Sequence, residues 1–188
     1  MRLLDYIKKP ITDYVKNLGT VHYQSDQKPP ETFKYNTNDI PEFVPQEYRQ
    51  TIVNNANEFD IDPRNVSAII HVENTPWDPK LKNPTPGSSA IGLGQHTDAY
   101  YKDINPIFKQ RFNRDYSKID PKDAIAATFI GLKQLKDRLG SEEDAIKAYH
   151  VGYEGLKNPS KEYDSHKKQA DEYFKKVISN LDPRNMVK

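Results

Sequence analysis

Three aspartate–proline or asparagine–proline pairs mark expected helix starts, and they constrain the fold of this chain more than any other feature. The pairs are Asp62-Pro63, Asp120-Pro121 and Asn158-Pro159. In each pair the first side chain can cap free backbone N–H groups. The proline suits the first helical position, where its missing N–H is not needed. The sequence therefore predicts helix starts spread along much of the chain.

Apolar residues recur at helical spacing around these starts, and Gly140 is placed to end one long helix. The apolar faces comprise Tyr48, Ile52, Ala56 and Phe59; Val66, Ile69 and Ile70; Ile125, Thr128, Phe129, Leu132, Leu135 and Leu139; and Tyr163, Ala170, Tyr173, Phe174, Val177 and Leu181. The last set predicts a helix over residues 159–181. No stretch alternates with a period of two for long enough to build a sheet. The expected fold class is mainly α.

Residues 1–40 differ in character from the rest of the chain. Apolar positions within 3–18 recur at helical spacing and predict an amphipathic helix, or two short helices. The stretch 19–45 is rich in proline, glutamine and asparagine, which indicates an extended connector. We expect an N-terminal helical and extended arm over 1–40 and one helical domain over 41–188.

Charge and composition exclude several classes of function. The chain has 28 Lys and Arg against 27 Asp and Glu, a net charge of +1 that argues against nucleic-acid binding. It has no cysteine, and its five histidines show no metal-ligand spacing, so neither a metal nor a cofactor is expected. No signal peptide or transmembrane helix is expected. The arm is less cationic than membrane-surface helices, so packing on protein is favoured over membrane contact.

Glu73 is the most informative single residue. It follows Val66, Ile69 and Ile70 by seven, four and three positions, so a continuing helix would place its carboxylate on the apolar face. Burial would raise its pKa and suit it to donate a proton to a leaving group, as cleavage of a glycosidic bond requires. The alternative is that the helix ends near Val72 and Glu73 turns into water.

Three segments resemble the lytic transglycosylase catalytic domain, a family related to goose-type lysozyme. Val66 to Glu73 is similar to the helix that ends in the catalytic Glu, Ala90 to Gln95 to the Gly-Leu-Met-Gln loop, and Ala148 to Gly152 to the Ala-Tyr-Asn-Ala-Gly segment. The resemblance covers about residues 45–156. It implies a lysozyme-like α-helical domain with a long loop around the active-site cleft. The chain departs from the family at Asn74, Gly94 and His150, where Ser, Met and Asn are usual.

The resemblance implies cleavage of the β-1,4 bond between N-acetylmuramic acid and N-acetylglucosamine in peptidoglycan. Glu73 would act as general acid and then as base, giving a 1,6-anhydromuramyl product, and the hydroxyl of Tyr149 would hold its carboxylate. The loop would meet the substrate through the Gln95 amide and the backbone from Gly92. The full set of expected substrate-binding residues is Gln95, Gly92, Leu93, His150 and Asn74.

Two alternatives remain at this stage. A lysozyme-type hydrolase would need a second carboxylate, for which Asp78, Asp98 and Asp103 are near in sequence. A non-catalytic structural virion protein could keep the fold and bind other virion proteins through its arm. The missing export signal and the arm together suggest a phage virion component. It would digest the wall locally during phage entry, in the periplasm or cell wall of the host.

Overall fold

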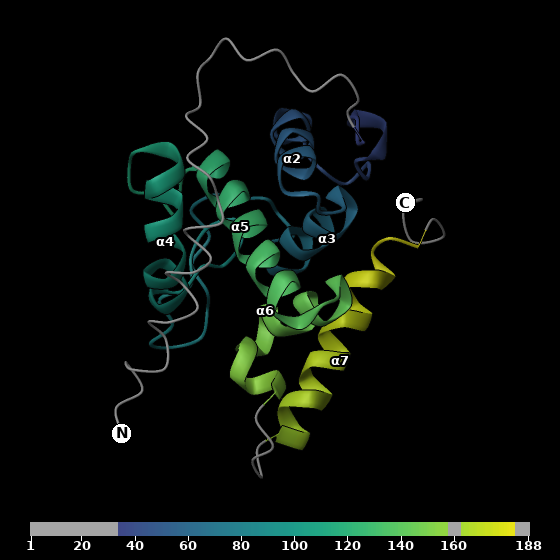
Figure 1. Ribbon diagram of the computed structural model, residues 1–188, viewed down its shortest axis with the longest axis vertical. Coiled ribbons are helices and arrows are strands. Elements are labelled where there is room, and N and C mark those ends of the chain that lie inside the picture. Colours follow the sequence, from purple (N-terminus) through teal and green to yellow (C-terminus); the bar gives the residue numbers. More distant parts are fainter. Residues whose placement is uncertain (1–33, 158–162, 183–188) are drawn as a thin grey trace.

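The computed structural model describes residues 34–157 and 163–182, and this part of the chain is built from helices (Figure 1). The elements are η1 (Thr37–Asp39), α2 (Gln46–Phe59), α3 (Pro63–Glu73), α4 (Asp98–Phe112), α5 (Pro121–Leu139), α6 (Glu142–Lys157) and α7 (Tyr163–Ser179). Within these ranges the only extended pairing is two isolated β-bridges, from Ile91 to Lys82 and to His96. The expected mainly α fold is confirmed.

Helix α5 is the centre of the domain. It packs against α2, α4 and α6, while α7 lies along α6 and also contacts α3 (Figure 1). Every residue of α5 from Asp123 to Leu132 is buried. A helix that is buried on all sides must be surrounded by other elements. This arrangement places the C-terminal end of α3 next to α7, which itself packs along α6.

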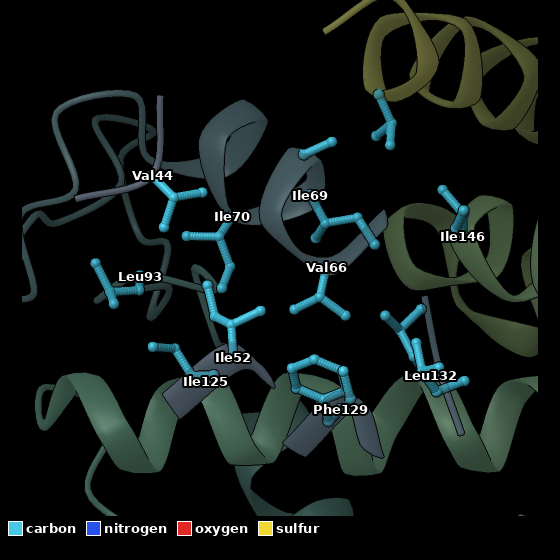
Figure 2. Close-up of a cluster of buried hydrophobic side chains, with 14 of the residues drawn as sticks. Val44, Ile52, Val66, Ile69, Ile70, Leu93, Ile125, Phe129, Leu132 and Ile146 are labelled. Atoms are coloured by element: carbon cyan, nitrogen blue, oxygen red, sulfur yellow. The ribbon is translucent and has the colours of Figure 1, made fainter. Parts of the chain in front are cut away.

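The main hydrophobic core lies where α2, α3, α5 and α6 meet. Figure 2 shows Ile52, Val66, Ile69, Ile70, Ile125, Phe129, Leu132 and Ile146 packed there, with Val44 and Leu93 from the connecting segments. A second cluster fills the space between α4 and α5 around Phe108 and Ile130. Trp77 and Leu93, from the loop between α3 and α4, belong to the main core, which fixes this loop against the rest of the domain.

The expected helix caps are confirmed wherever the structure describes them. The Asp62 side chain accepts a hydrogen bond from the Arg64 N–H at 2.9 Å, and Asp120 accepts from the Asp123 N–H at 3.0 Å. Gly140 ends α5 in the left-handed conformation, with φ of 83°. Asn158-Pro159 and the amphipathic segment of the arm lie outside the described residues. The division into residues 1–40 and 41–188 stays a prediction.

No helix within residues 34–157 or 163–182 is both long and apolar enough to cross a bilayer.

Candidate active site

Glu73 is the last residue of α3, and its carboxylate faces the protein. The preceding residues of its stripe, Val66, Ile69 and Ile70, are fully buried, and Glu73 itself is half-buried. The helix ends here because Asn74 takes a non-helical conformation. Both sequence interpretations are therefore partly correct, since the helix does stop near Val72 but the carboxylate does not turn away into water.

The hydroxyl of Tyr173 holds the carboxylate of Glu73. It donates a hydrogen bond to Glu73 Oε1 over 2.7 Å, and joins α7 to the end of α3. Burial raises the pKa of Glu73, and the Tyr173 hydrogen bond and the positive charge of Lys176 oppose this rise only in part. A carboxyl group with a raised pKa retains its proton closer to neutral pH and can act as a general acid.

The ring of His150 lies flat on the ring of Tyr173. Their centroids are 4.5 Å apart and their planes differ by 7°. Tyr173 is buried whereas His150 is exposed, so the imidazole covers Tyr173 on the solvent side. Residues from α3, α6 and α7 thus form one connected group, which we call the carboxylate cluster: Glu73, Tyr173 and His150.

Tyr149 lies near this cluster but makes a different hydrogen bond from the one that the resemblance implies. Its hydroxyl donates to the backbone oxygen of Gly94 at 2.9 Å, and the bond to Glu73 comes from Tyr173 instead. Burial raises the pKa of Tyr149, and the negative charge of Glu73 adds to the rise. Tyr149 therefore ties α6 to the loop beside the carboxylate.

Asn74 is buried and holds the loop between α3 and α4. Its side-chain Nδ2 donates to the backbone oxygens of Asp78 at 2.6 Å and Gly92 at 3.1 Å, and its Oδ1 accepts from the Asp78 N–H at 3.0 Å. Gln95 holds the same loop, since its Nε2 donates hydrogen bonds to the backbone oxygens of Leu81 and Gly92, each at 3.0 Å. The amide groups expected to meet substrate thus hold the loop in shape.

Leu93 and Gly92 are both buried within the protein. The side chain of Leu93 is fully buried in the main core beside Ile70 and Ile125 (Figure 2). Gly92 has φ of 83°, and its backbone N–H and oxygen are both used within the loop. A Cβ there would overlap the backbone oxygen of Lys118. Of the expected substrate-binding residues, His150 is exposed and Gln95 is half-buried.

Trp77 anchors the same loop. Its side chain is 5% exposed and stacks on Tyr48, with ring centroids 5.8 Å apart. Its indole N–H donates to His71 Nδ1 at 3.3 Å. Trp77 is therefore a hydrophobic anchor for the loop.

Gly94 has no side chain because His96 and Thr128 occupy the space. A Cβ at Gly94 would overlap His96 Nε2 and crowd the Thr128 hydroxyl. The departure from the family's Met is thereby explained, since a larger residue at position 94 cannot coexist with this imidazole. A histidine ring packs against this glycine instead.

His96 is enclosed in an aromatic pocket between the loop, α4 and α5. Its ring stacks on Tyr100 at 4.4 Å and meets the edge of Tyr116 at 5.9 Å. Its Nε2 lies 3.1 Å from the hydroxyl of Thr128, which itself donates to the Ala124 backbone oxygen. The imidazole is therefore the donor to Thr128, as a neutral ring. Burial lowers the pKa of His96 to about 3, and nearby Lys118 acts in the same direction.

The three candidates for a second carboxylate are occupied elsewhere or exposed. The Asp78 carboxylate accepts from the Lys80 N–H at 2.8 Å, and Asp98 pairs with Lys118 at 2.6 Å. Asp103 lies exposed on α4. Across residues 34–157 and 163–182, none of the three forms a hydrogen bond with Glu73. The same ranges hold no group of three or more His, Cys, Asp or Glu residues that could bind a metal ion.

A comparison with models of protein families gives a match over most of the described residues. The model of one protein family, described as the transglycosylase SLT domain, matches residues 50–172. The comparison with curated proteins finds no match. The family match extends past residue 156, where the motif resemblance ends, and includes ten residues of α7. Tyr173 follows directly after the matched range.

Proposed function

The chain belongs to the transglycosylase SLT domain family, and we propose that Glu73 is its catalytic acid and base. The family comprises lytic transglycosylases that act on peptidoglycan, so the protein is an enzyme of that class. One observation carries the assignment of Glu73. It is a half-buried carboxylate at the end of an apolar helix stripe, held by a single tyrosine hydroxyl, with its pKa raised by burial.

The proposed reaction needs this one carboxyl group. Protonated Glu73 gives its proton to the bridging oxygen as the glycosidic bond breaks, and the acetamido oxygen of the substrate bonds to the anomeric carbon. The Glu73 carboxylate then takes the proton from the C6 hydroxyl of the muramyl residue. The C6 oxygen displaces the acetamido oxygen at the anomeric carbon, and the product is a 1,6-anhydro ring. No water is consumed, and Glu73 ends the cycle protonated.

The neighbouring residues support this chemistry in two ways. We propose that Tyr173 orients the carboxylate of Glu73, and that Tyr149 keeps the loop next to it through its hydrogen bond to Gly94. For Asn74, Gly92 and Leu93 we propose a role in holding the loop, in place of direct contact with substrate. Gln95 and His150 are the members of the expected set that are not buried, and of the two we keep Gln95 as the proposed substrate contact.

Tyr173→Phe tests the proposed orientation of the carboxylate. Because a hydrogen bond to a charged group contributes about 1.5–3 kcal/mol, we expect its loss to lower kcat on purified peptidoglycan by about 10- to 100-fold. The donated hydrogen bond opposes the raised pKa of Glu73, so its removal should move the basic limb of the pH profile of kcat to higher pH. An unchanged kcat and an unchanged profile would contradict the role given to Tyr173.

We further propose that the arm over residues 1–40 attaches the enzyme to a phage particle for local wall digestion during entry. The support is the amphipathic spacing over residues 3–18 and the proline-rich connector over 19–45, both of which lie before the matched range of 50–172. We expect gradient-purified virions of the phage to carry the full chain and to lose it when residues 1–33 are deleted. Purified peptidoglycan should be cleaved equally by both forms. Full incorporation of the deleted form would contradict the proposal.

A further inference from the structure

His150 makes a contact that the proposed reaction does not by itself require. Its imidazole lies on the face of Tyr173, whose hydroxyl in turn donates to Glu73 over 2.7 Å. We propose that His150 is a positioning residue, which holds the Tyr173 ring in the orientation that directs its hydroxyl to the carboxylate. This inference rests on the proposed role of Glu73 and adds to it a dependence on the residue at position 150.

The geometry of the contact supports a positioning role. The two rings are nearly parallel, at 7°, so the imidazole covers one face of the phenol and blocks a swing of the Tyr173 side chain about χ1 toward that side. Such a swing would displace the hydroxyl and lengthen its hydrogen bond to Glu73. His150 lies in the last helical turn of α6 before the break at Gly152, which has φ of 78° and ψ of 161°. An asparagine at position 150 has no ring to stack.

The charges around His150 give the contact a pH dependence. The face of His150 that lies on Tyr173 is shielded from water, and this partial burial lowers the pKa of His150; Lys176 on α7 acts in the same direction, so the ring is mostly neutral near pH 7. The carboxylate of Glu73 on α3 accepts the hydrogen bond of the Tyr173 hydroxyl. In the preceding turn of α6, the ammonium of Lys147 is paired with Glu143 and Asp171. His150 is thus a titratable ring exposed to solvent and in contact with the donor to the catalytic acid.

Protonation of His150 has a defined effect on this group. An imidazolium over the Tyr173 ring withdraws electron density and makes the phenol a stronger donor. A stronger hydrogen bond to the carboxylate favours the ionised form of Glu73, which has no proton to give. With a general acid alone, kcat would reach a plateau at low pH, where the acid is fully protonated. We expect kcat to fall there instead, as pH decreases through the pKa of His150.

The test compares His150→Ala and His150→Phe with the wild-type chain on purified peptidoglycan. His150→Ala removes the stack and should lower kcat about tenfold at pH 7 while KM changes little, because orientation acts in the transition state. His150→Phe restores a flat ring without a charge. It should recover most of the lost kcat and should lack the fall of kcat on the acid side. His166→Ala on α7 is the matched control, because His166 is outside the carboxylate cluster.

Several outcomes would overturn the inference. A raised KM with unchanged kcat in His150→Ala would show a substrate contact instead of a positioning role. No rescue by His150→Phe, with both variants folded by their thermal unfolding curves, would show that stacking is not the function. An acid-side fall that persists in His150→Phe would remove His150 as its origin. Failure of the wild-type chain to cleave peptidoglycan would instead reject the proposed function, so the two failures are distinguishable.

Discussion

Replacing Glu73 with Gln should reduce the release of soluble fragments from peptidoglycan by about 10³-fold or more. General acid–base catalysis contributes about 10²–10⁴-fold to rates, and here one carboxyl group serves both steps of the reaction. Gln matches the size of Glu and can still accept the Tyr173 hydrogen bond, but it has no proton to donate to a leaving oxygen. The rate is measured as the release of muropeptides from purified sacculi.

The stability of the variant separates lost chemistry from lost structure. Burial raises the pKa of Glu73, so its ionised form disfavours folding as pH rises through the folded-state pKa. The Gln variant should therefore unfold at the same temperature as the wild type, or at a higher one, above neutral pH. A Gln variant that unfolds at or above the wild-type temperature and still retains a tenth or more of the wild-type rate would contradict the assignment of Glu73.

The second large effect is a loss of stability in mild acid caused by His96. The pKa of His96 is about 3 in the folded protein and is near 6.5 in an exposed histidine. The unfolded chain therefore binds the proton more readily, and the contribution to stability is complete above pH 6.5 and decreases as pH falls toward 3. The expected loss in the free energy of unfolding is about 2 kcal/mol between pH 7 and pH 5.

His96→Phe isolates this contribution. Phe can keep the stack on Tyr100 but loses the hydrogen bond to Thr128, so we expect it to cost about 1–2 kcal/mol at pH 7. Between pH 7 and pH 5 the variant should lose less stability than the wild type, by about 2 kcal/mol. Urea unfolding in this range avoids most carboxylate titration. Equal losses in both proteins would show that His96 is not the buried proton acceptor.

The architecture could be predicted from the sequence because its signals are local. The Asp62-Pro63 and Asp120-Pro121 pairs predict helix starts through contacts within two or three residues, and the caps form as expected. Glu73 could be found for the same reason, since its position on the apolar stripe depends only on the helix that carries it. These features need no knowledge of how the helices pack.

The partners of Glu73 could not be predicted, because they come from distant parts of the chain. Tyr173 is 100 residues away and lies on the apolar face of its helix, where a tyrosine is typical of the core. Its only sequence signal was membership of that face. The role of Tyr149 was inferred from resemblance, and in the structure its hydroxyl donates a hydrogen bond to the Gly94 backbone oxygen instead of to Glu73.

The loop shows a second limit of sequence analysis. Small residues such as Gly92 and Gly94 suggest a backbone that approaches something closely, but the sequence does not identify the neighbour. The structure shows protein on both sides, the Lys118 backbone at Gly92 and the His96 ring at Gly94. The same holds for Asn74, whose amide is equally able to bind a sugar or a buried backbone, and which binds the backbone.

Mass spectrometry of the fragments released from purified peptidoglycan tests the central claim most directly. The wild-type chain is predicted to release fragments that end in 1,6-anhydromuramic acid, which are lighter by one water than reducing-end fragments, and Glu73→Gln is predicted to release almost none. Wild-type fragments with reducing ends would contradict the account and would require a second carboxylate or an activated water. Absence of fragments from a folded wild-type chain would favour a structural protein with this fold.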